Sequence, residues 1–187
     1  MDPELIPQEL NASQLLLGSD HAPPTSGRLH APGSASAGHP PRVLAVSSGG
    51  GHWVQLLRLK PAFEDCLVTY ATVHEGYRSQ VPHAAFHVIP DSHRADKSSL
   101  LPSILRTLVL LHRLRPDVIV STGAAPGYFA VRFGRWFRAR TVWIDSIANA
   151  EKLSLSGQML RRHADLWLTQ WPHLAREDGP QCLGNVL

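Results

Sequence analysis

With 187 residues, of which 43% are hydrophobic, the chain is long enough to bury the core of one domain. Its two cysteines exclude a disulfide framework and favour a reducing compartment, its 11 histidines form no metal-ligand spacing such as HExxH, and no apolar run is long enough to indicate a membrane span. Residues 1–41 carry a net charge of −3 and the remainder +6, and so basic a domain favours anionic partners such as nucleic acid, phosphorylated substrates or acidic lipid surfaces.

The N-terminal 41 residues do not have the pattern of a folded segment. From His21 to Pro41 almost every residue is Pro, Gly, Ala, Ser or His, and such a composition buries too little apolar surface to offset the entropy of ordering the chain. The first residues are acidic and lack the basic start and apolar region of a signal peptide. We therefore expect a disordered tail over 1–41 and a single folded domain over 42–187.

The folded part opens with RVLAVSSGGGHWVQLL, residues 42–57. The apolar run predicts a buried strand, the glycines predict a tight turn, and the pattern after them predicts a helix that begins near His52. The start of a helix has unpaired N–H groups and the positive end of the helix dipole, and glycines let a phosphate approach that backbone closely. The residues expected to bind an anion in this turn are Gly49, Gly50 and Gly51.

This glycine turn matches neither of two familiar nucleotide-binding motifs. A dinucleotide fingerprint requires G-x-G-x-x-G and a P-loop requires Gly-Lys-Ser/Thr, and neither occurs here. What remains is a general anion-binding turn followed by a histidine, a side chain that exchanges protons near neutral pH. We expect His52 to act as a general base or to contact a bound diphosphate; the alternative is a histidine that caps or packs at the helix start.

Beyond this helix the sequence predicts alternating strands and helices. We expect strands at Leu67–Val73, Ala85–Ile89, Asp117–Ser121, Thr141–Ile144, Asp165–Thr169 and from Asn185 onward, and helices from a cap at Ser98 or Ser99 to Leu114, from Gly127 to Phe137, and over Ser156–His163. Such alternation implies right-handed βαβ units and a parallel sheet. The predicted fold class is therefore α/β, a Rossmann-like parallel sheet with helices on both faces.

Two further segments follow strands at the edge where parallel sheets bind ligands. The first is the glycine-rich turn STGAAPG, where hydroxyl and backbone groups can donate to a diphosphate; an ordinary strand-to-helix turn is the alternative. Its candidate residues are Ser121, Thr122 and Gly123. The second is the loop DSIANAE, where Asp145 or Glu151 can serve as the base instead of His52. The alternative for this loop is a helix-capping role.

Two segments bear on membranes. Residues 100–114 are apolar except for a narrow stripe that contains Ser103, Arg106 and Arg113, and we expect a buried helix that covers the sheet. The stretch RFGRWFRAR interleaves arginines with aromatic side chains, a pattern that suits an anionic bilayer surface or single-stranded nucleic acid. No RNA-binding motif accompanies it, so we expect a lipid surface and no nucleic acid. The residues expected at that surface are Arg132, Arg135, Trp136, Phe137 and Arg138.

Four stretches in order, SSGGGHWVQLLRL, STGAAPG, VWIDSIANAEKLSLSG and ADLWLTQWPHLA, together resemble the PssD-type bacterial exopolysaccharide glycosyltransferase proteins. Those proteins are similar to the membrane-recruiting subunit of the two-part eukaryotic transferase that adds the second N-acetylglucosamine to dolichyl-diphosphate-linked N-acetylglucosamine. The resemblance covers residue 42 to the C-terminus. It implies the N-terminal, acceptor-side half of a GT-B enzyme that is split into two chains. The related undivided MurG-type enzymes have two Rossmann domains in one chain and a similar Gly-Gly-His turn near the lipid diphosphate.

The reaction that this resemblance implies is inverting glycosyl transfer, in which a base removes a proton from the acceptor hydroxyl and UDP departs. No metal or other cofactor is expected, because helix dipoles and basic groups can stabilise the leaving diphosphate. The implied partners are a PssE-like chain that supplies most of the UDP-sugar site, a donor that is UDP-glucuronic acid or UDP-N-acetylglucosamine, and a polyprenyl-diphosphate-linked sugar as acceptor. The implied location is cytoplasmic, peripheral on the inner face of the plasma membrane.

Two other functions remain open from the sequence. The first is a non-catalytic adaptor that only recruits the catalytic chain to the membrane. The second is a stand-alone nucleotide-binding protein. The eukaryotic relatives tend to carry Glu where Asp145 stands, which leaves the role of that carboxylate open.

Overall fold

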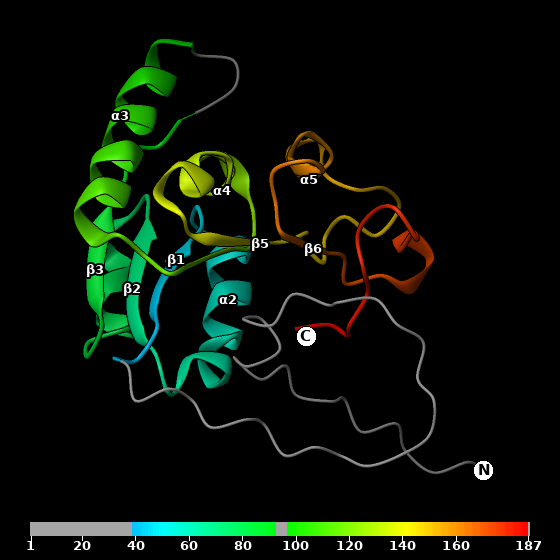
Figure 1. Cartoon of the computed structure of the whole chain (residues 1–187), viewed down its shortest axis with the longest axis horizontal. Coiled ribbons are helices and arrows are strands. Elements are labelled where there is room, and N and C mark those ends of the chain that lie inside the picture. Colours follow the sequence, from blue (N-terminus) through cyan, green and yellow to red (C-terminus); the bar gives the residue numbers. More distant parts are fainter. Residues whose placement is uncertain (1–38, 93–96, 187) are drawn as a thin grey trace.

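The computed structural model describes residues 39–92 and 97–186. Almost all of the N-terminal segment that we expect to be a disordered tail therefore lies outside the described residues. The described part is built around one sheet with helices on both faces (Figure 1). Within it, no helix has the length and hydropathy needed to cross a bilayer.

The sheet has six parallel strands in the order β3-β2-β1-β4-β5-β6. Parallel strands connected through helices confirm the predicted α/β, Rossmann-like class. Their bounds are β1 Arg42–Val46, β2 Leu67–Thr72, β3 Ala85–Val88, β4 Val118–Ser121, β5 Arg140–Ile144 and β6 Leu166–Leu168. The strand order reverses between β1 and β4, and this is where a Rossmann sheet leaves a crevice beyond its carboxyl ends.

The central strands are continuous apolar runs because both faces of the sheet are covered. From β1, Val43 and Ala45 face a core that includes Trp53 and Leu56 of helix α2, Gly51–Arg58. The alternate residues of β1 face a second core, formed with α3, Lys97–Leu114, α4, Ala124–Gly134, and α5, Leu155–Leu160. Figure 1 shows α2 on one side of the sheet and α4 on the other.

Several predicted boundaries are wrong for local reasons. Helix α3 already includes Lys97, so neither Ser98 nor Ser99 caps it. Helix α4 begins at Ala124, three residues before the predicted start, because Gly123 at φ 138° turns the chain sharply after β4. It ends at Gly134, and a short 3₁₀ turn, Arg135–Phe137, continues the predicted helix.

The end of the chain also differs from the prediction. Residues 182–186 form no strand, so the strand expected from Asn185 is absent from the described part. Instead, Gln181 makes a single parallel bridge to Leu168 at the sheet edge.

Helix α3 packs Leu110 and Leu111 onto the sheet and exposes Arg106 and Arg113 as predicted, but the rest of its predicted polar stripe is wrong. Ser103, which we expected on a polar stripe, is fully buried together with Thr107, whose hydroxyl donates to the Ser103 carbonyl at 2.8 Å. The exposed face carries apolar side chains one turn apart: Leu101 is 60% exposed, Leu105 54% and Val109 42%. A helix that exposes such a stripe is not simply a cover for the sheet.

At the edge opposite the strand carboxyl ends, an ion pair joins the starts of β1 and β4. Arg42 Nη2 lies 2.9 Å from Asp117 Oδ1, and the backbone N–H of Arg42 donates to Asp117 Oδ2 at 2.9 Å. The hydrogen bonds from Arg42 lower the pKa of the Asp117 carboxyl.

Candidate functional site

The two glycine-rich turns lie next to each other because the strands that precede them are neighbours. In the register of the parallel pair β1–β4, Val46 lies opposite Ser121, so both strands end at the same level of the sheet. The turn after β1 contains Gly49, Gly50 and Gly51, and the turn after β4 contains Thr122 and Gly123. The structure thus brings these two predicted segments together. Gln55 joins the start of the third, since its Nε2 donates to the carbonyl oxygen of Gly51 at 3.3 Å and to the Ser146 hydroxyl at 3.1 Å.

The first glycine turn is open on its outer side. Gly50 has φ 63° and ψ −136°, a conformation that only glycine adopts readily. A Cβ atom built at Gly50 or Gly51 meets nothing within 4 Å. No side chain caps α2, and its first turn contains no acidic residue. Its first N–H groups are therefore available to an anion in the space above the turn.

His52 ties this turn to the second one. Its Nδ1 lies 2.8 Å from the carbonyl oxygen of Thr122, and the Thr122 hydroxyl donates to the carbonyl oxygen of His52 at 2.7 Å. Because a carbonyl oxygen only accepts, Nδ1 carries the proton, and the lone pair of the neutral ring is on Nε2. The half-buried imidazole is thus held so that Nε2 is the nitrogen that can accept a proton.

The ring of His52 rests directly on Gly123. A Cβ atom at Gly123 would lie 2.4 Å from both Cε1 and Nδ1 of the imidazole, which is closer than atoms can approach. Gly123 is therefore needed both for its positive φ and for the room that it leaves to His52.

The hydroxyl groups predicted to contact a diphosphate have internal partners instead. Ser121 and Thr122 are fully buried. The Ser121 hydroxyl accepts from the N–H of Gly123 at 3.2 Å, and the Thr122 hydroxyl bonds to His52. Their burial does not fit direct contact with a ligand, so these side chains shape the turn from beneath.

Asp145 is the centre of a loop rather than an exposed carboxylate. It is 2% exposed, and its oxygens accept from Asn149 Nδ2 at 2.7 Å and from the N–H groups of Ser146 and Ser154, both at 3.1 Å. The backbone of Gly157 lies close above, since a Cβ there would be 2.6 Å from Oδ2. This carboxylate binds the loop after β5 to the start of α5.

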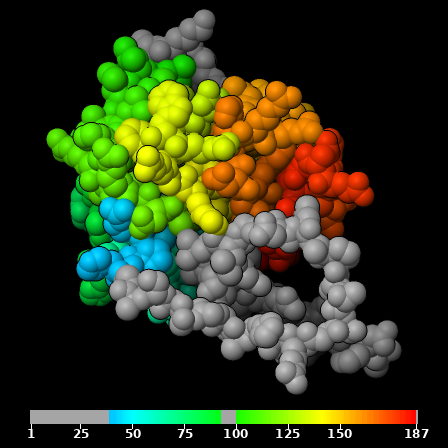
Figure 2. Space-filling view, viewed as in Figure 1, coloured from blue at the N-terminus to red at the C-terminus, as the bar shows by residue number. Residues whose placement is uncertain are grey.

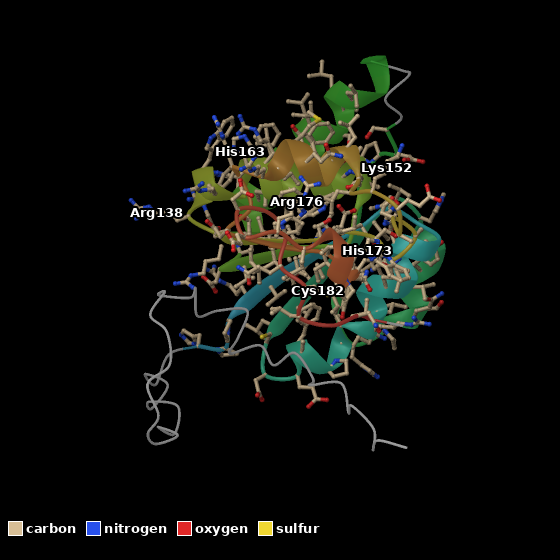
Figure 3. All side chains as sticks on the ribbon, turned by 90° about the vertical axis from the view of Figure 1, so that its right-hand side faces the viewer. Arg138, Lys152, His163, His173, Arg176 and Cys182 are labelled. Atoms are coloured by element: carbon tan, nitrogen blue, oxygen red, sulfur yellow. The ribbon has the colours of Figure 1, made fainter. Side chains whose placement is uncertain are left out.

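Glu151 lies elsewhere, at the surface. It lines a cavity of about 350 Å³ with Lys152, Arg161 and Arg176, and no residue of either glycine turn lines that cavity. Figure 3 looks onto this face, with Lys152 and Arg176 labelled. The structure therefore does not bring Glu151 to the turn that carries His52.

A buried amide pair that the sequence did not indicate connects α2 to the loop after β5. Gln170 Nε2 donates to Gln55 Oε1 at 2.7 Å and to the carbonyl oxygen of Asp145 at 2.9 Å. Gln55 Oε1 also accepts from the N–H of Ile147 at 3.1 Å, and its Nε2 donates to the Ser146 hydroxyl. The one sequence signal for this pair is the position of Gln55 among the apolar residues of α2, which indicates that its side chain is buried.

A tyrosine beside the first turn was also missed. The hydroxyl of Tyr77, in the 3₁₀ helix Glu75–Gln80, accepts from the N–H of Gly50 at 2.9 Å. Its ring stacks on Trp53, with centroids 5.0 Å apart. The segment EGYRSQ has no periodic pattern, and its distance of 27 residues along the chain from Gly50 hid the contact.

The expected membrane-surface residues divide into two groups. Trp136 is 65% exposed, Arg135 and Arg138 are exposed beside it, and Arg132 is partly exposed. Phe137 is instead partly buried against the core, where the His112 ring lies 6.5 Å from it and Arg115 Cζ lies 5.8 Å from its centroid. Phe137 therefore connects α3 to this segment rather than facing solvent.

Comparison with known proteins gives a family match and a fold match. Residues 83–184 match the family described as "Oligosaccharide biosynthesis protein Alg14 like". The chain is 25% identical to the UDP-N-acetylglucosamine transferase subunit of Yarrowia lipolytica, over 73% of this chain and 76% of that protein. It is also 25% identical to the subunit of the same name in Mus musculus, over 78% of this chain and 83% of that protein.

Among solved structures, MurG from Acinetobacter baumannii aligns with a TM-score of 0.62 at 13% identity, covering 76% of this chain and 45% of MurG. A UDP-N-acetylglucosamine 2-epimerase aligns with a TM-score of 0.59 at 13% identity, covering 78% of this chain and 46% of the epimerase. The chain thus spans about half the length of the solved proteins that share its fold.

Proposed function

Because the chain belongs to the family of Alg14-like oligosaccharide biosynthesis proteins, we propose that it is the acceptor-binding subunit of a two-part UDP-sugar glycosyltransferase. The acceptor is a polyprenyl-diphosphate-linked sugar, as expected for exopolysaccharide assembly of the PssD type. The observation that carries this proposal is the open glycine turn with His52 fixed beside it. The diphosphate lies against the N–H groups at the start of α2, where the turn offers donors and no acidic side chain.

In this proposal His52 is the base. The sugar hydroxyl of the acceptor donates its proton to Nε2 as its oxygen attacks the anomeric carbon of the donor. The bond from that carbon to the β-phosphate oxygen of UDP breaks, UDP departs, and the configuration inverts. The bond from Nδ1 to the Thr122 carbonyl stabilises the imidazolium that forms. Asp145 contributes by shaping its loop, because three hydrogen bonds already occupy its carboxylate.

The donor site belongs mainly to a second chain, by analogy with the split GT-B enzymes. The relatives named as UDP-N-acetylglucosamine transferase subunits support UDP-N-acetylglucosamine as the donor over UDP-glucuronic acid. The carboxyl edge of the sheet, with the glycine turns, faces the cleft that a PssE-like partner completes. Activity then requires both chains, and neither a metal nor another cofactor takes part.

A membrane-facing surface fits the same proposal. Leu101, Leu105 and Val109 of α3 and Trp136 after α4 are the apolar part of this surface, which we call the basic–apolar face. Its cations are Arg106, Arg113, Arg132, Arg135 and Arg138, and α3 contains no acidic residue. Helices α3 and α4 pack together on the same side of the sheet, and Figure 2 shows them on one face of the molecule. Such a surface suits peripheral binding to anionic lipid, where a polyprenyl acceptor resides.

The experiment that tests this function is transfer by the reconstituted pair. The chain is co-expressed with a PssE-like partner and supplied with UDP-N-acetylglucosamine and a short-chain polyprenyl-diphosphate sugar. We expect turnover that requires both chains and that His52→Ala lowers by about 10²-fold or more, with the complex intact. Unchanged turnover by an intact His52→Ala complex would instead support the non-catalytic adaptor, and tight UDP-sugar binding by this chain alone would support a stand-alone nucleotide-binding protein.

A further inference from the structure

Tyr77 stands at the edge of the open glycine turn and contacts its backbone. Its hydroxyl oxygen accepts the hydrogen bond from the N–H of Gly50 at 2.9 Å. A Cβ atom at Gly49 would lie 3.1 Å from the same hydroxyl and 2.9 Å from Cδ2 of His74. The first glycine therefore leaves room for these two side chains, so that the turn and the tyrosine fit each other closely.

The position of Tyr77 is fixed by aromatic packing. Its ring stacks on Trp53 with centroids 5.0 Å apart and planes at 21°. Trp53 is fully buried, and its indole N–H donates to Gln80 Oε1 at 2.9 Å, which ties α2 to the 3₁₀ helix that carries Tyr77. The hydroxyl is thus held at the turn by contacts that do not depend on a ligand.

The hydrogen bonds of this hydroxyl are not all used by the protein. A phenol oxygen can accept and can donate one proton, and the bond from Gly50 uses the oxygen as an acceptor. The O–H proton is left to donate, and no acceptor for it is found among the described residues. A Cβ atom built at Gly50 or Gly51 in the same turn meets nothing within 4 Å, so the outer side of the turn is open to a ligand.

We propose that the Tyr77 hydroxyl donates a hydrogen bond to an anionic oxygen of the diphosphate bound above Gly50 and Gly51. This inference rests on the proposed function, because it assigns a further ligand contact to the same site. Tyr77 positions the turn through Gly50 N–H and binds the anion through its own proton, so one hydroxyl links the backbone to the ligand. A hydrogen bond to a charged group is strong enough to matter for affinity.

The test uses the full chain labelled with ¹⁵N and inorganic pyrophosphate as the probe, with affinity read from the amide resonances of Gly50 and Gly51. The variant is Tyr77→Phe, which keeps the ring on Trp53 and removes only the hydroxyl. The matched control is Tyr70→Phe, because Tyr70 also packs against Trp53, at 5.8 Å between centroids, but belongs to β2. We expect Tyr77→Phe to bind pyrophosphate about tenfold more weakly and Tyr70→Phe to bind it as the wild type does.

A second readout separates ligand contact from a purely structural role. In unligated Tyr77→Phe, the amide resonances of Gly51 and His52 stay at their wild-type positions if the turn keeps its shape. Weaker binding with unmoved resonances supports the inference. The inference would be overturned if Tyr77→Phe bound pyrophosphate as tightly as Tyr70→Phe, or if the wild type did not bind pyrophosphate. It would also be overturned if the Gly51 and His52 resonances of unligated Tyr77→Phe were displaced, because a changed turn would then account for the weaker binding.

The proposed function is judged separately, by transfer in the reconstituted pair. Pyrophosphate binding that depends on Tyr77, together with no transfer by the pair, would refute the function and leave the anion contact standing. Transfer that Tyr77→Phe leaves unchanged in acceptor KM would refute the contact and leave the function standing.

Discussion

His52 and Thr122 bind each other at two points, from Nδ1 to the Thr122 carbonyl at 2.8 Å and from the Thr122 hydroxyl to the His52 carbonyl at 2.7 Å. These residues are 70 positions apart in the sequence, and they follow two strands, β1 and β4, that are neighbours in the sheet. The reciprocal pair makes one rigid unit of the two glycine turns. It also fixes the proton on Nδ1, so the lone pair of the neutral ring is on Nε2.

Gly123→Ala tests whether transfer activity depends on the position of the His52 ring against the second glycine turn. The added methyl would lie 2.4 Å from the imidazole at a residue with φ 138°, so we expect a loss of about 2 kcal/mol in unfolding free energy. We also expect transfer activity to fall by more than the unfolded fraction of the variant accounts for. Gly76→Ala is the control, because nothing lies within 4 Å of a Cβ there. Urea unfolding and the transfer assay measure the two effects. Wild-type activity in Gly123→Ala would show that His52 need not occupy its observed place.

Gln55→Ala tests the buried amide pair. The substitution leaves the Gln170 amide and the N–H of Ile147 without their acceptor, so we expect a destabilisation of about 1–3 kcal/mol. Gln181→Ala, at an exposed position whose side chain makes no hydrogen bond within the described residues, should cost no more than about 0.5 kcal/mol. Denaturant unfolding of both variants provides the comparison, and equal effects would mean that the network contributes nothing particular.

Leu105→Glu tests the basic–apolar face. Leu105 is 54% exposed on α3, and a carboxylate there removes apolar contact and repels anionic lipid. We expect binding to mixed phosphatidylcholine–phosphatidylglycerol vesicles to weaken about tenfold. Leu67→Glu is the matched control, because Leu67 is 56% exposed at the start of β2, away from that face. Equal weakening by the two substitutions would contradict a specific membrane-facing surface.

Asp117→Asn tests whether the ion pair between Arg42 and Asp117 makes the stability of the fold depend on pH. The folded-state pKa of Asp117 is lowered by hydrogen bonds from Arg42, so its contribution is fully present above the unfolded pKa of about 3.9 and is lost as the pH falls through the lower folded value. We expect the variant to melt below the wild type at neutral pH and the difference in Tm to shrink in acid. A difference in Tm that stays constant down to the lowest pH at which both fold would exclude this ion pair as its source.

The strands and the glycine turns could be predicted because their signals are local. Val43–Val46 and Val118–Ser121 are apolar runs, and the glycines after them mark turns at the same sheet edge. Tyr77 and Gln170 could not be predicted in this way, since each acts through a partner that only the fold brings near. The exposed apolar stripe of α3 was missed because apolar residues occur all around the helix, and composition alone does not say which of them face solvent.

The roles of the polar candidates depended on burial, which residue type does not reveal. Ser121, Thr122 and Asp145 have suitable functional groups, yet all three are enclosed and hydrogen-bonded within the protein. His52 differs because one ring nitrogen is bound and the ring is only half-buried. This difference in partners, rather than in chemistry, is the reason that we propose His52 among the candidates.

Diphosphate binding at the glycine turn is tested most directly by the acceptor KM of the reconstituted pair with Gly51→Glu, compared with Gly51→Ala. Both side chains enter open space at the first position of α2, and an acid there stabilises the helix start, so neither should impair folding. If a diphosphate binds at this turn, the added carboxylate raises the acceptor KM by about tenfold or more, while the alanine, which adds only an uncharged methyl group to the same space, raises it less. An acceptor KM that is the same in Gly51→Glu, Gly51→Ala and the wild type would contradict diphosphate binding at the glycine turn.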